Sequence, residues 1–299
     1  MPDTSSQALP PELELVLHAR PRDLGSLIVR RVLPAPVRKL VGPFVFFDHM
    51  GPVVMAAGSG VDVRPHPHIG LATVTYLFEG EIVHRDSLGY EQPIRPGDVN
   101  WMVAGRGIVH SERTAPERRQ QPHPLHGIQA WVALPEAQQE CEPSFVHHPA
   151  STLPRLSQPG IELHLIAGEA YGLRSPVAVA SPTFYAALQL SAAAELALPD
   201  QHAERGLYVV SGAVECAGRR LEEGDLAVAR PGSSLRITAA EGGARLMLLG
   251  GAKLEGERHI FWNFVSTSEA RIEQAKQAWR EQRFARVPSD AVEFTPLPE

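Results

Sequence analysis

Pro65-His66-Pro67-His68 and His110-Ser111-Glu112 are the two motifs in residues 60–112 that decide this fold. In an extended strand, side chains two positions apart point to the same face. Both histidines of the first motif would therefore face one way from one strand, and the histidine and glutamate of the second would do so from another. If the two strands face each other in a small barrel, three imidazoles and one carboxylate converge. The spacing predicts a metal site.

The residues around these motifs have the pattern of short strands. Runs of β-branched and aromatic residues are separated by turns rich in Gly and Pro, and they occupy residues 44–47, 73–78, 82–84, 99–103 and 129–134. The run at 44–47 is expected to end in a turn at Asp48-His49-Met50-Gly51-Pro52. Closely spaced short strands with such turns indicate an all-β sandwich or barrel.

The chain is long enough for two domains. Its 299 residues, 43% of them hydrophobic, can build two cores. Tyr208-Val209-Val210-Ser211-Gly212 is similar to Tyr76-Leu77-Phe78-Glu79-Gly80, which indicates an internal repeat and two copies of one fold. A Pro-rich zone between the copies has the composition of a linker. The predicted division is an N-terminal domain at 12–140, a linker at 141–160 and a C-terminal domain at 161–299.

The second copy does not repeat the four candidate ligands. His202 and Glu204 stand near the position of the first motif, and Ser233-Ser234-Leu235-Arg236-Ile237 stands where the second motif would fall. Two ligands without a second pair make a poor metal site. The C-terminal domain is therefore expected to be degenerate and to hold no metal.

A helix is predicted near the C-terminus. Ser266-Thr267-Ser268-Glu269 has the form of a capping box, and Ile272, Ala275 and Trp279 follow at the spacing of one helical face. This helix is expected to pack on one side of the barrels.

Composition excludes several classes of function. A net charge of −6 and a pI of about 6.1 argue against direct nucleic-acid binding and against an anionic membrane surface. No run approaches about 18 apolar residues, and residues 1–14 lack the pattern of an export signal. Two distant cysteines, Cys141 and Cys216, indicate no disulfide framework and fit the reducing cytoplasm.

Several motifs together resemble the pirin family of the cupin superfamily over roughly residues 27–284. They are His66-Pro67-His68-Ile69-Gly70, Glu79-Gly80, Pro96-Gly97-Asp98, Trp101-Met102, residues 104–112 and Trp262-Asn263-Phe264. The resemblance implies a bicupin of two stacked jelly-roll β-barrels, with one metal in the N-terminal barrel. Carried over by position, the metal ligands are His66, His68, His110 and Glu112.

This donor set suits a divalent transition metal better than Mg or Ca. Fe(II) is the first choice, with Ni, Mn, Cu or Zn as alternatives, and the residues do not choose between Fe and Ni. Four protein ligands leave one or two positions open on a five- or six-coordinate ion, and an open position distinguishes a catalytic metal from a structural one.

The resemblance implies quercetin 2,3-dioxygenase activity, with a flavonol-like aromatic substrate and O₂ as partners. The flavonol's 3-hydroxyl and 4-carbonyl oxygens would occupy open metal positions, Glu112 would act as both ligand and catalytic base, and ring opening would release carbon monoxide. An alternative is a redox-responsive regulatory binding protein that acts on a protein partner without turnover. A Zn-dependent cupin similar to sugar isomerases is a third. Trp101, Arg106 and His126 are candidates for the pocket mouth.

Overall fold

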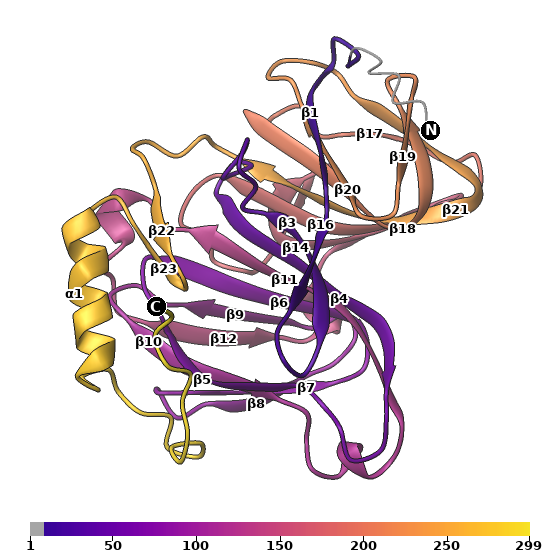
Figure 1. The fold of residues 1–299 in the computed structure, drawn as a ribbon. Coiled ribbons are helices and arrows are strands. Elements are labelled where there is room, and N and C mark those ends of the chain that lie inside the picture. Colours follow the sequence, from indigo (N-terminus) through magenta and orange to yellow (C-terminus); the bar gives the residue numbers. More distant parts are fainter. Residues whose placement is uncertain (1–8) are drawn as a thin grey trace, which may run out of the picture.

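The computed structural model describes residues 9–299, which form two β-units with one helix beside the first unit (Figure 1). The first eight residues, to which part of the export-signal prediction refers, lie outside the described residues. The larger sheet of the first unit has the order β12-β9-β6-β11-β4-β3-β2. Its strands are β2 (Arg20–Asp23), β3 (Ile28–Leu33), β4 (Phe44–Met55), β6 (Leu71–Glu79), β9 (Val99–Val103), β11 (His123–Ala133) and β12 (Ser144–His148).

A four-stranded sheet of order β5-β10-β7-β8 faces the larger sheet across the first unit. Its strands are β5 (Asp62–His68), β7 (Ile82–Asp86), β8 (Glu91–Ile94) and β10 (Ile108–Arg113). From β4 to β7, and again from β8 to β11, the chain crosses from one sheet to the other at each step. This antiparallel alternation is the jelly-roll arrangement, and it places the two predicted ligand motifs on neighbouring strands.

The second unit is built on one ten-stranded sheet whose main order is β1-β20-β18-β21-β16-β14-β13. Its strands are β1 (Leu13–His18), β13 (Arg155–Gln158), β14 (Ile161–Ala170), β15 (Leu173–Arg174), β16 (Thr183–Leu190), β17 (Glu195–Ala197), β18 (Glu204–Cys216), β19 (Arg219–Glu222), β20 (Asp225–Ala229) and β21 (Arg236–Gly251). The prediction of two all-β units with a C-terminal helix is confirmed.

The strand pairing does not follow the predicted domain limits. β1 precedes the first unit in sequence but pairs with β20 of the second. Within the predicted linker, β12 pairs with β9 of the first unit, whereas β13 pairs with β14 of the second. The limits 12–140, 141–160 and 161–299 stay a prediction, and β1 ties the two units together.

The largest apolar cluster lies between the units and includes buried residues of both. Phe44 meets Tyr185 with ring centroids 5.2 Å apart, and Phe47 meets Tyr208 at 4.9 Å. Large aromatic side chains of this kind bury much of the apolar area that stabilises an interface. Apolar packing between the two units therefore stabilises the first unit.

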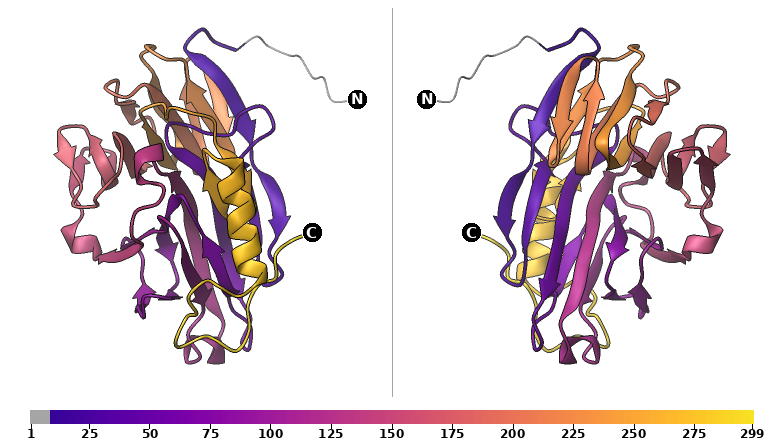
Figure 2. Two further views of the ribbon diagram at one scale, coloured as in Figure 1. Left: turned by 90° about the vertical axis from the view of Figure 1, so that its left-hand side faces the viewer. Right: turned by 90° about the vertical axis from the view of Figure 1, so that its right-hand side faces the viewer.

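The predicted helix is α1 (Glu269–Arg280), with Ile272, Ala275 and Trp279 buried as expected. Its N-cap is Ser268, whose side chain accepts a hydrogen bond from the Arg271 amide, so the predicted capping box on Ser266 is wrong. With β22 (His259–Phe261) and β23 (Phe264–Ser266), the helix packs beside the first unit (Figure 2). A parallel bridge between Ile69 and Phe264 joins this C-terminal segment to the end of β5.

The five predicted strand runs fall on β4, β6, β7, β9 and β11, and only Leu134, at the end of the last run, lies outside its strand. The expected turn after residues 44–47 is wrong, because β4 continues through residues 48–52 to Met55. Its register with β11 shifts beside Gly51, and this irregularity accommodates the Gly-Pro pair within the strand. Within residues 9–299, no helix has the length and apolar character needed to cross a membrane.

Two buried histidines lie at the interface between the units. His49 Nε2 is 2.9 Å from His126 Nε2, and His49 Nδ1 is 3.0 Å from the Tyr208 hydroxyl. Burial, together with the nearby charge of Arg30, lowers the pKa of His49 to about 2. Burial, with Arg245 adding to it, lowers the pKa of His126 to about 4. The folded protein therefore holds both rings neutral.

Acid is expected to destabilise the fold through this pair. The unfolded histidines have a pKa near 6.5, so from pH 6.5 down to pH 4 the unfolded chain binds protons that the folded chain does not. The free energy of unfolding should then fall by up to ~1.4 kcal/mol per pH unit for each histidine. Urea unfolding at pH 7, 6, 5 and 4.5 should show a shallower decline for the double variant His49→Gln, His126→Gln. Equal slopes would contradict this assignment.

Candidate metal centre

The two ligand motifs lie on paired antiparallel strands. In the register of β5 and β10, His110 stands opposite His66, and Ile108 stands opposite His68. The register shifts between His110 and Glu112, where β5 contains one extra residue. A bulge of this kind bends a strand and re-aims the side chains beside it.

The structure brings the three predicted histidines together. One ring nitrogen from each of His66, His68 and His110 lies within 4.8 Å of the others, and all three side chains are buried. His68 Nε2 and His110 Nε2 are 3.1 Å apart. Among residues 9–299, this is the one group of three such side chains with metal-ligand spacing.

The outward-facing nitrogens of two rings are already in contact with polar groups. His66 Nδ1 donates to the carbonyl oxygen of Arg64 at 2.8 Å, so its Nε2 carries the lone pair. His110 Nδ1 is 3.3 Å from Nδ1 of His84. Burial lowers the pKa of His66 to about 4 and the pKa values of His68 and His110 well below their ordinary value. Neutral rings with free lone pairs are the form that binds metals.

Glu112 borders the same cavity but is not part of the three-histidine group. Its Oε1 lies 3.1 Å from Thr75 Oγ1, which in turn lies 2.7 Å from Gln129 Oε1. Burial raises the pKa of Glu112 above its ordinary value, while the neighbouring imidazole of His84 and hydrogen bonds from Thr75 and Gln129 oppose the increase. The carboxylate is thus placed at the site and poorly solvated, and its role as fourth ligand stays a prediction.

These residues fit a divalent transition metal. Three buried neutral imidazoles whose ring nitrogens converge are a donor set for Fe, Ni, Cu, Mn or Zn. Without a metal, Nε2 of His68 and Nε2 of His110 point at each other. The Glu112 carboxylate lines the same cavity. Hard-ion sites for Mg or Ca would need several oxygen ligands instead.

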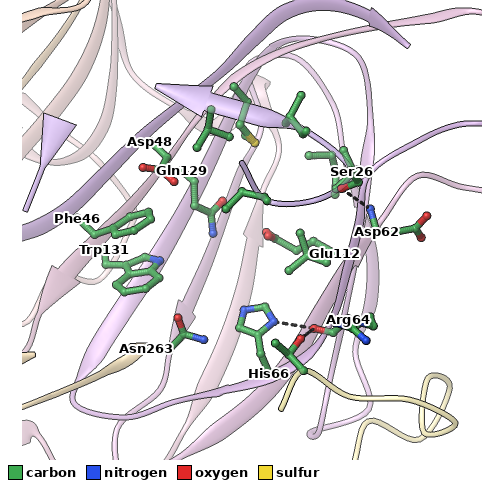
Figure 3. A pocket seen from close by; sticks show the side chains of 18 of the residues that line it. Ser26, Phe46, Asp48, Asp62, Arg64, His66, Glu112, Gln129, Trp131 and Asn263 are labelled. Atoms are coloured by element: carbon green, nitrogen blue, oxygen red, sulfur yellow. Dashed lines mark hydrogen bonds between the residues drawn. The ribbon is translucent and has the colours of Figure 1, made fainter. Parts of the chain in front are cut away.

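The site opens into a cavity of about 390 Å³, a volume typical of small-molecule sites. Figure 3 shows Glu112 and His66 on one wall, with Phe46 and Trp131 on the opposite side. The Phe46 and Trp131 rings are stacked, with centroids 3.9 Å apart and planes 11° from parallel. The other apolar lining residues are Leu24, Leu27, Val29, Met50, Val61, Val63, Ile82 and Trp262.

An ion pair lies at the aromatic side of the cavity. Arg31 binds both carboxylate oxygens of Asp48 at 2.8 Å, and its guanidinium carbon lies 4.4 Å from the centre of the Phe46 ring. Gln129 and Asn263 add amide groups to the lining. The cavity therefore combines flat apolar walls with a few polar groups suited to a hydroxylated aromatic molecule.

The three residues expected at the pocket mouth lie elsewhere, and that prediction is wrong. Trp101 belongs to the apolar cluster between the units. Arg106 pairs with Glu142 on the surface at 2.8 Å, and His126 contacts His49 at the interface. Strand alternation indicates that neighbours face opposite ways, but the sequence does not indicate which face of the larger sheet meets the second unit.

His202 and Glu204 of the second unit have other contacts. His202 Nε2 donates to the Glu169 carbonyl oxygen at 2.8 Å, and its ring stacks on Phe184. Glu204 accepts from the Gly42 amide at 2.7 Å and pairs with Arg38 at 3.0 Å. Glu204 thus helps to join the two units.

The C-terminal residues 288–297, here called the C-terminal strap, contact β5 and β10. The Thr295 amide donates to the Pro65 carbonyl at 2.8 Å, and Thr295 borders the cavity. Arg113 binds Asp290 through Nε at 2.6 Å and Nη2 at 3.0 Å, and it also binds Glu293. The sequence did not indicate this contact, because no local pattern pairs residues so far apart.

Replacing Arg113 by alanine is expected to loosen the C-terminal strap. The variant loses a bidentate charge-assisted contact of about 1–2 kcal/mol, so hydrogen exchange of the Thr295 amide should become about tenfold faster. Arg119→Ala is the matched control. Arg113 and Arg119 both bind Asp62, but Arg119 makes none of the strap contacts described above. Unchanged exchange in the Arg113 variant, measured by mass spectrometry, would show that other contacts hold the strap.

Comparison with known proteins identifies both units. The profile of the Pirin family matches residues 26–132, and that of the Pirin C-terminal cupin domain matches residues 185–285. A pirin-like protein of Caulobacter vibrioides is 49% identical over 290 residues, covering 96% of this chain and 100% of the relative. A Pseudomonas aeruginosa protein provisionally named quercetin 2,3-dioxygenase is 40% identical over 297 residues, covering 97% and 92%.

Solved structures agree with the fold. Quercetin 2,3-dioxygenase from Acinetobacter baumannii superposes with a TM-score of 0.88 at 33% identity, covering 95% of both chains. A bacterial pirin from Escherichia coli, solved in complex with nickel(II), has a TM-score of 0.63 at 18% identity, covering 80% of this chain and 99% of that one. The predicted bicupin architecture is confirmed.

Proposed function

Because the chain belongs to the pirin family, we propose that it is a metal-dependent dioxygenase that opens the central ring of a flavonol such as quercetin and releases carbon monoxide. The observation that carries this proposal is a group of three buried neutral imidazoles, with Glu112 beside them, at an aromatic-walled cavity. The names of two relatives as quercetin 2,3-dioxygenases support the choice of substrate class.

His66, His68, His110 and Glu112 would hold the metal ion. A divalent transition metal bound there would lower the pKa of a flavonol 3-hydroxyl group, as such ions do for bound water. We propose Fe(II) as the metal. Reconstitution with Fe(II), Ni(II), Mn(II), Cu(II) and Zn(II) in turn tests this choice. The two cysteines are unpaired, which suits a reducing cytoplasm, and we place the protein there.

Glu112 accepts the proton of the 3-hydroxyl group. Its raised pKa brings the carboxylate closer to the basicity that a general base needs near neutral pH. Thr75 contacts the carboxylate at the cavity wall, and the hydrogen bonds of Thr75 and Gln129 oppose the increase in its pKa that burial causes. The deprotonated flavonol then reacts with O₂, and one carbon of the central ring leaves as carbon monoxide.

The cavity walls hold the flat substrate. The stacked pair of Phe46 and Trp131 offers an aromatic surface to one ring, and aromatic stacking of this kind contributes about 0.5–1.5 kcal/mol beyond apolar burial. Arg31, Asp48 and Gln129 can bind phenolic hydroxyl groups at that side. The aliphatic side chains of the remaining wall exclude water from the reacting ring.

The test is aerobic turnover of quercetin by protein reconstituted separately with each of the five metals. Visible absorbance should fall and carbon monoxide should form with one metal, and both should be lost in the His66→Ala variant. Stoichiometric metal binding without turnover would overturn the proposal. It would favour the alternative of a regulatory binding protein, whose partner should then be captured in a metal-dependent manner.

A further inference from the structure

A buried histidine and a buried aspartate stand directly behind the predicted metal ligands. His84 and Asp86 lie on β7, which pairs with β10 so that Asp86 is opposite His110 and His84 is opposite Glu112. Their exposed fractions are 4% and 0%. Burial of an imidazole beside a carboxylate is costly unless both are hydrogen-bonded, so their contacts indicate what they do.

Asp86 is held in one orientation by the backbone. Its Oδ1 accepts hydrogen bonds from the amides of Leu88 at 2.9 Å and Tyr90 at 3.1 Å. Its Oδ2 is 2.9 Å from Nε2 of His84. The His84 ring stacks on Phe145, with centroids 4.3 Å apart and planes 11° from parallel, which prevents it from rotating freely.

These contacts determine which ring nitrogens of His84 and His110 are protonated, starting from the Asp86 carboxylate. A carboxylate only accepts, so Nε2 of His84 is the donor, and Nδ1 of a neutral His84 carries the lone pair. That Nδ1 faces Nδ1 of His110 at 3.3 Å, so His110 donates there. Nε2 of His110 is therefore left with its lone pair, and it is the nitrogen that faces His68.

We propose that Asp86 and His84 are positioning residues that set the tautomer of His110 and so prepare its Nε2 to bind the metal. The inference rests on the metal site of the proposed function but not on any turnover. Metal-bound histidines are commonly oriented by a carboxylate on the other ring nitrogen. Here the carboxylate acts through a second imidazole. Asp86 determines which nitrogen of His84 is protonated, and His84 in turn determines which nitrogen of His110 is protonated.

Asp86→Asn tests the direction of this chain without changing its shape. To keep the bonds from Leu88 and Tyr90, the new amide must direct its oxygen at them and its NH₂ group at His84. His84 then has to accept at Nε2 and donate at Nδ1, which forces His110 to protonate Nε2. We expect Zn(II) affinity, measured by competition with a chelator, to fall about 10–100-fold.

A matched control exists in the second unit. Asp225 contacts His18 Nδ1 through one oxygen at 2.6 Å and accepts the Glu222 amide at 3.0 Å through the other. Asp225→Asn makes the same chemical change at a more exposed aspartate–histidine pair in the other unit. It should leave Zn(II) affinity unchanged.

A pair of His84 variants separates hydrogen bonding from packing. His84→Gln can still accept from His110 Nδ1 through its amide oxygen, whereas His84→Leu fills similar space without an acceptor. Zn(II) affinity should decline from the natural protein to His84→Gln and further to His84→Leu. Equal or reversed affinities of the two variants would indicate a packing role and overturn the proposal.

A spectroscopic readout tests the tautomer itself. In ¹⁵N-histidine-labelled protein loaded with Zn(II), His110 should show a protonated Nδ1 and a metal-bound Nε2, and Asp86→Asn should lose this pattern. If Asp86→Asn keeps both the pattern and an affinity within about twofold, the inference fails. If His66→Ala still abolishes Zn(II) binding in that case, the metal site stands without it.

Discussion

Replacing His66 by alanine is expected to lower the affinity for a divalent transition metal by more than about 100-fold and to abolish flavonol turnover. The loss should exceed the 10–100-fold that follows removal of an outer partner of a ligand, because one of three converging nitrogens disappears. Metal content after dialysis against a chelator, measured by mass spectrometry, should fall from about one ion per chain to near zero.

His123→Ala is a closely matched control for this variant. Both histidines are 8% exposed, and both donate from Nδ1 to the carbonyl oxygen two residues earlier, at 2.8 Å for His66 and 3.0 Å for His123. His123 lies outside the three-histidine group. Equal metal loss in both variants, with unchanged circular dichroism, would show that His66 affects the site only through packing.

Replacing Glu112 by glutamine is expected to reduce kcat by about 10²–10⁴-fold, the usual contribution of a general base. Glutamine keeps the size of the side chain and its contact with Thr75 but cannot accept the substrate proton. The three histidines remain, so most of the bound metal should be retained. Turnover that stays within about threefold while metal remains bound would exclude the role of Glu112 as base.

The Thr75→Val variant tests the role of Glu112 as base through the pKa of its carboxylate. The Thr75 hydroxyl helps to lower the pKa of Glu112 against the raising effect of burial. Its removal should raise that pKa further, so the acidic limb of the pH–rate profile should move to higher pH. An unmoved limb would mean that another group controls it.

The sequence was sufficient for the part of the site that depends on local spacing. His66 and His68, two residues apart in a strand-forming segment, face one way by geometry alone, and the same holds for the second motif. Glu112 is less determined, because the bulge opposite it on β5 decides how closely its carboxylate approaches the rings. Bulges have only a weak local sequence signal.

A partial signal was present for His84 and Asp86. They are two residues apart, but the predicted strand at 82–84 ends at His84, and only the structure extends β7 to Asp86 and places both on one strand. What the sequence lacked was the neighbour, because only the pairing of β7 with β10 sets His84 behind His110. The candidates Trp101 and His126 were wrong for a related reason, since both face the second unit.

Long-range exchange of segments was beyond local patterns. Nothing in residues 13–18 indicates that they pair with β20, more than 200 positions later. The strap contact between Arg113 and Asp290 is equally remote. Such contacts follow from the three-dimensional arrangement of the two units, and single-sequence periodicity carries no information on them.

The most direct test of this account is anomalous diffraction from crystals of the metal-loaded protein. We predict one peak per chain, bound by the ring nitrogens of His66, His68 and His110, with the Glu112 carboxylate as the fourth ligand. A peak elsewhere, or protein that crystallises in saturating metal without a peak among the three histidines, would contradict the central claim.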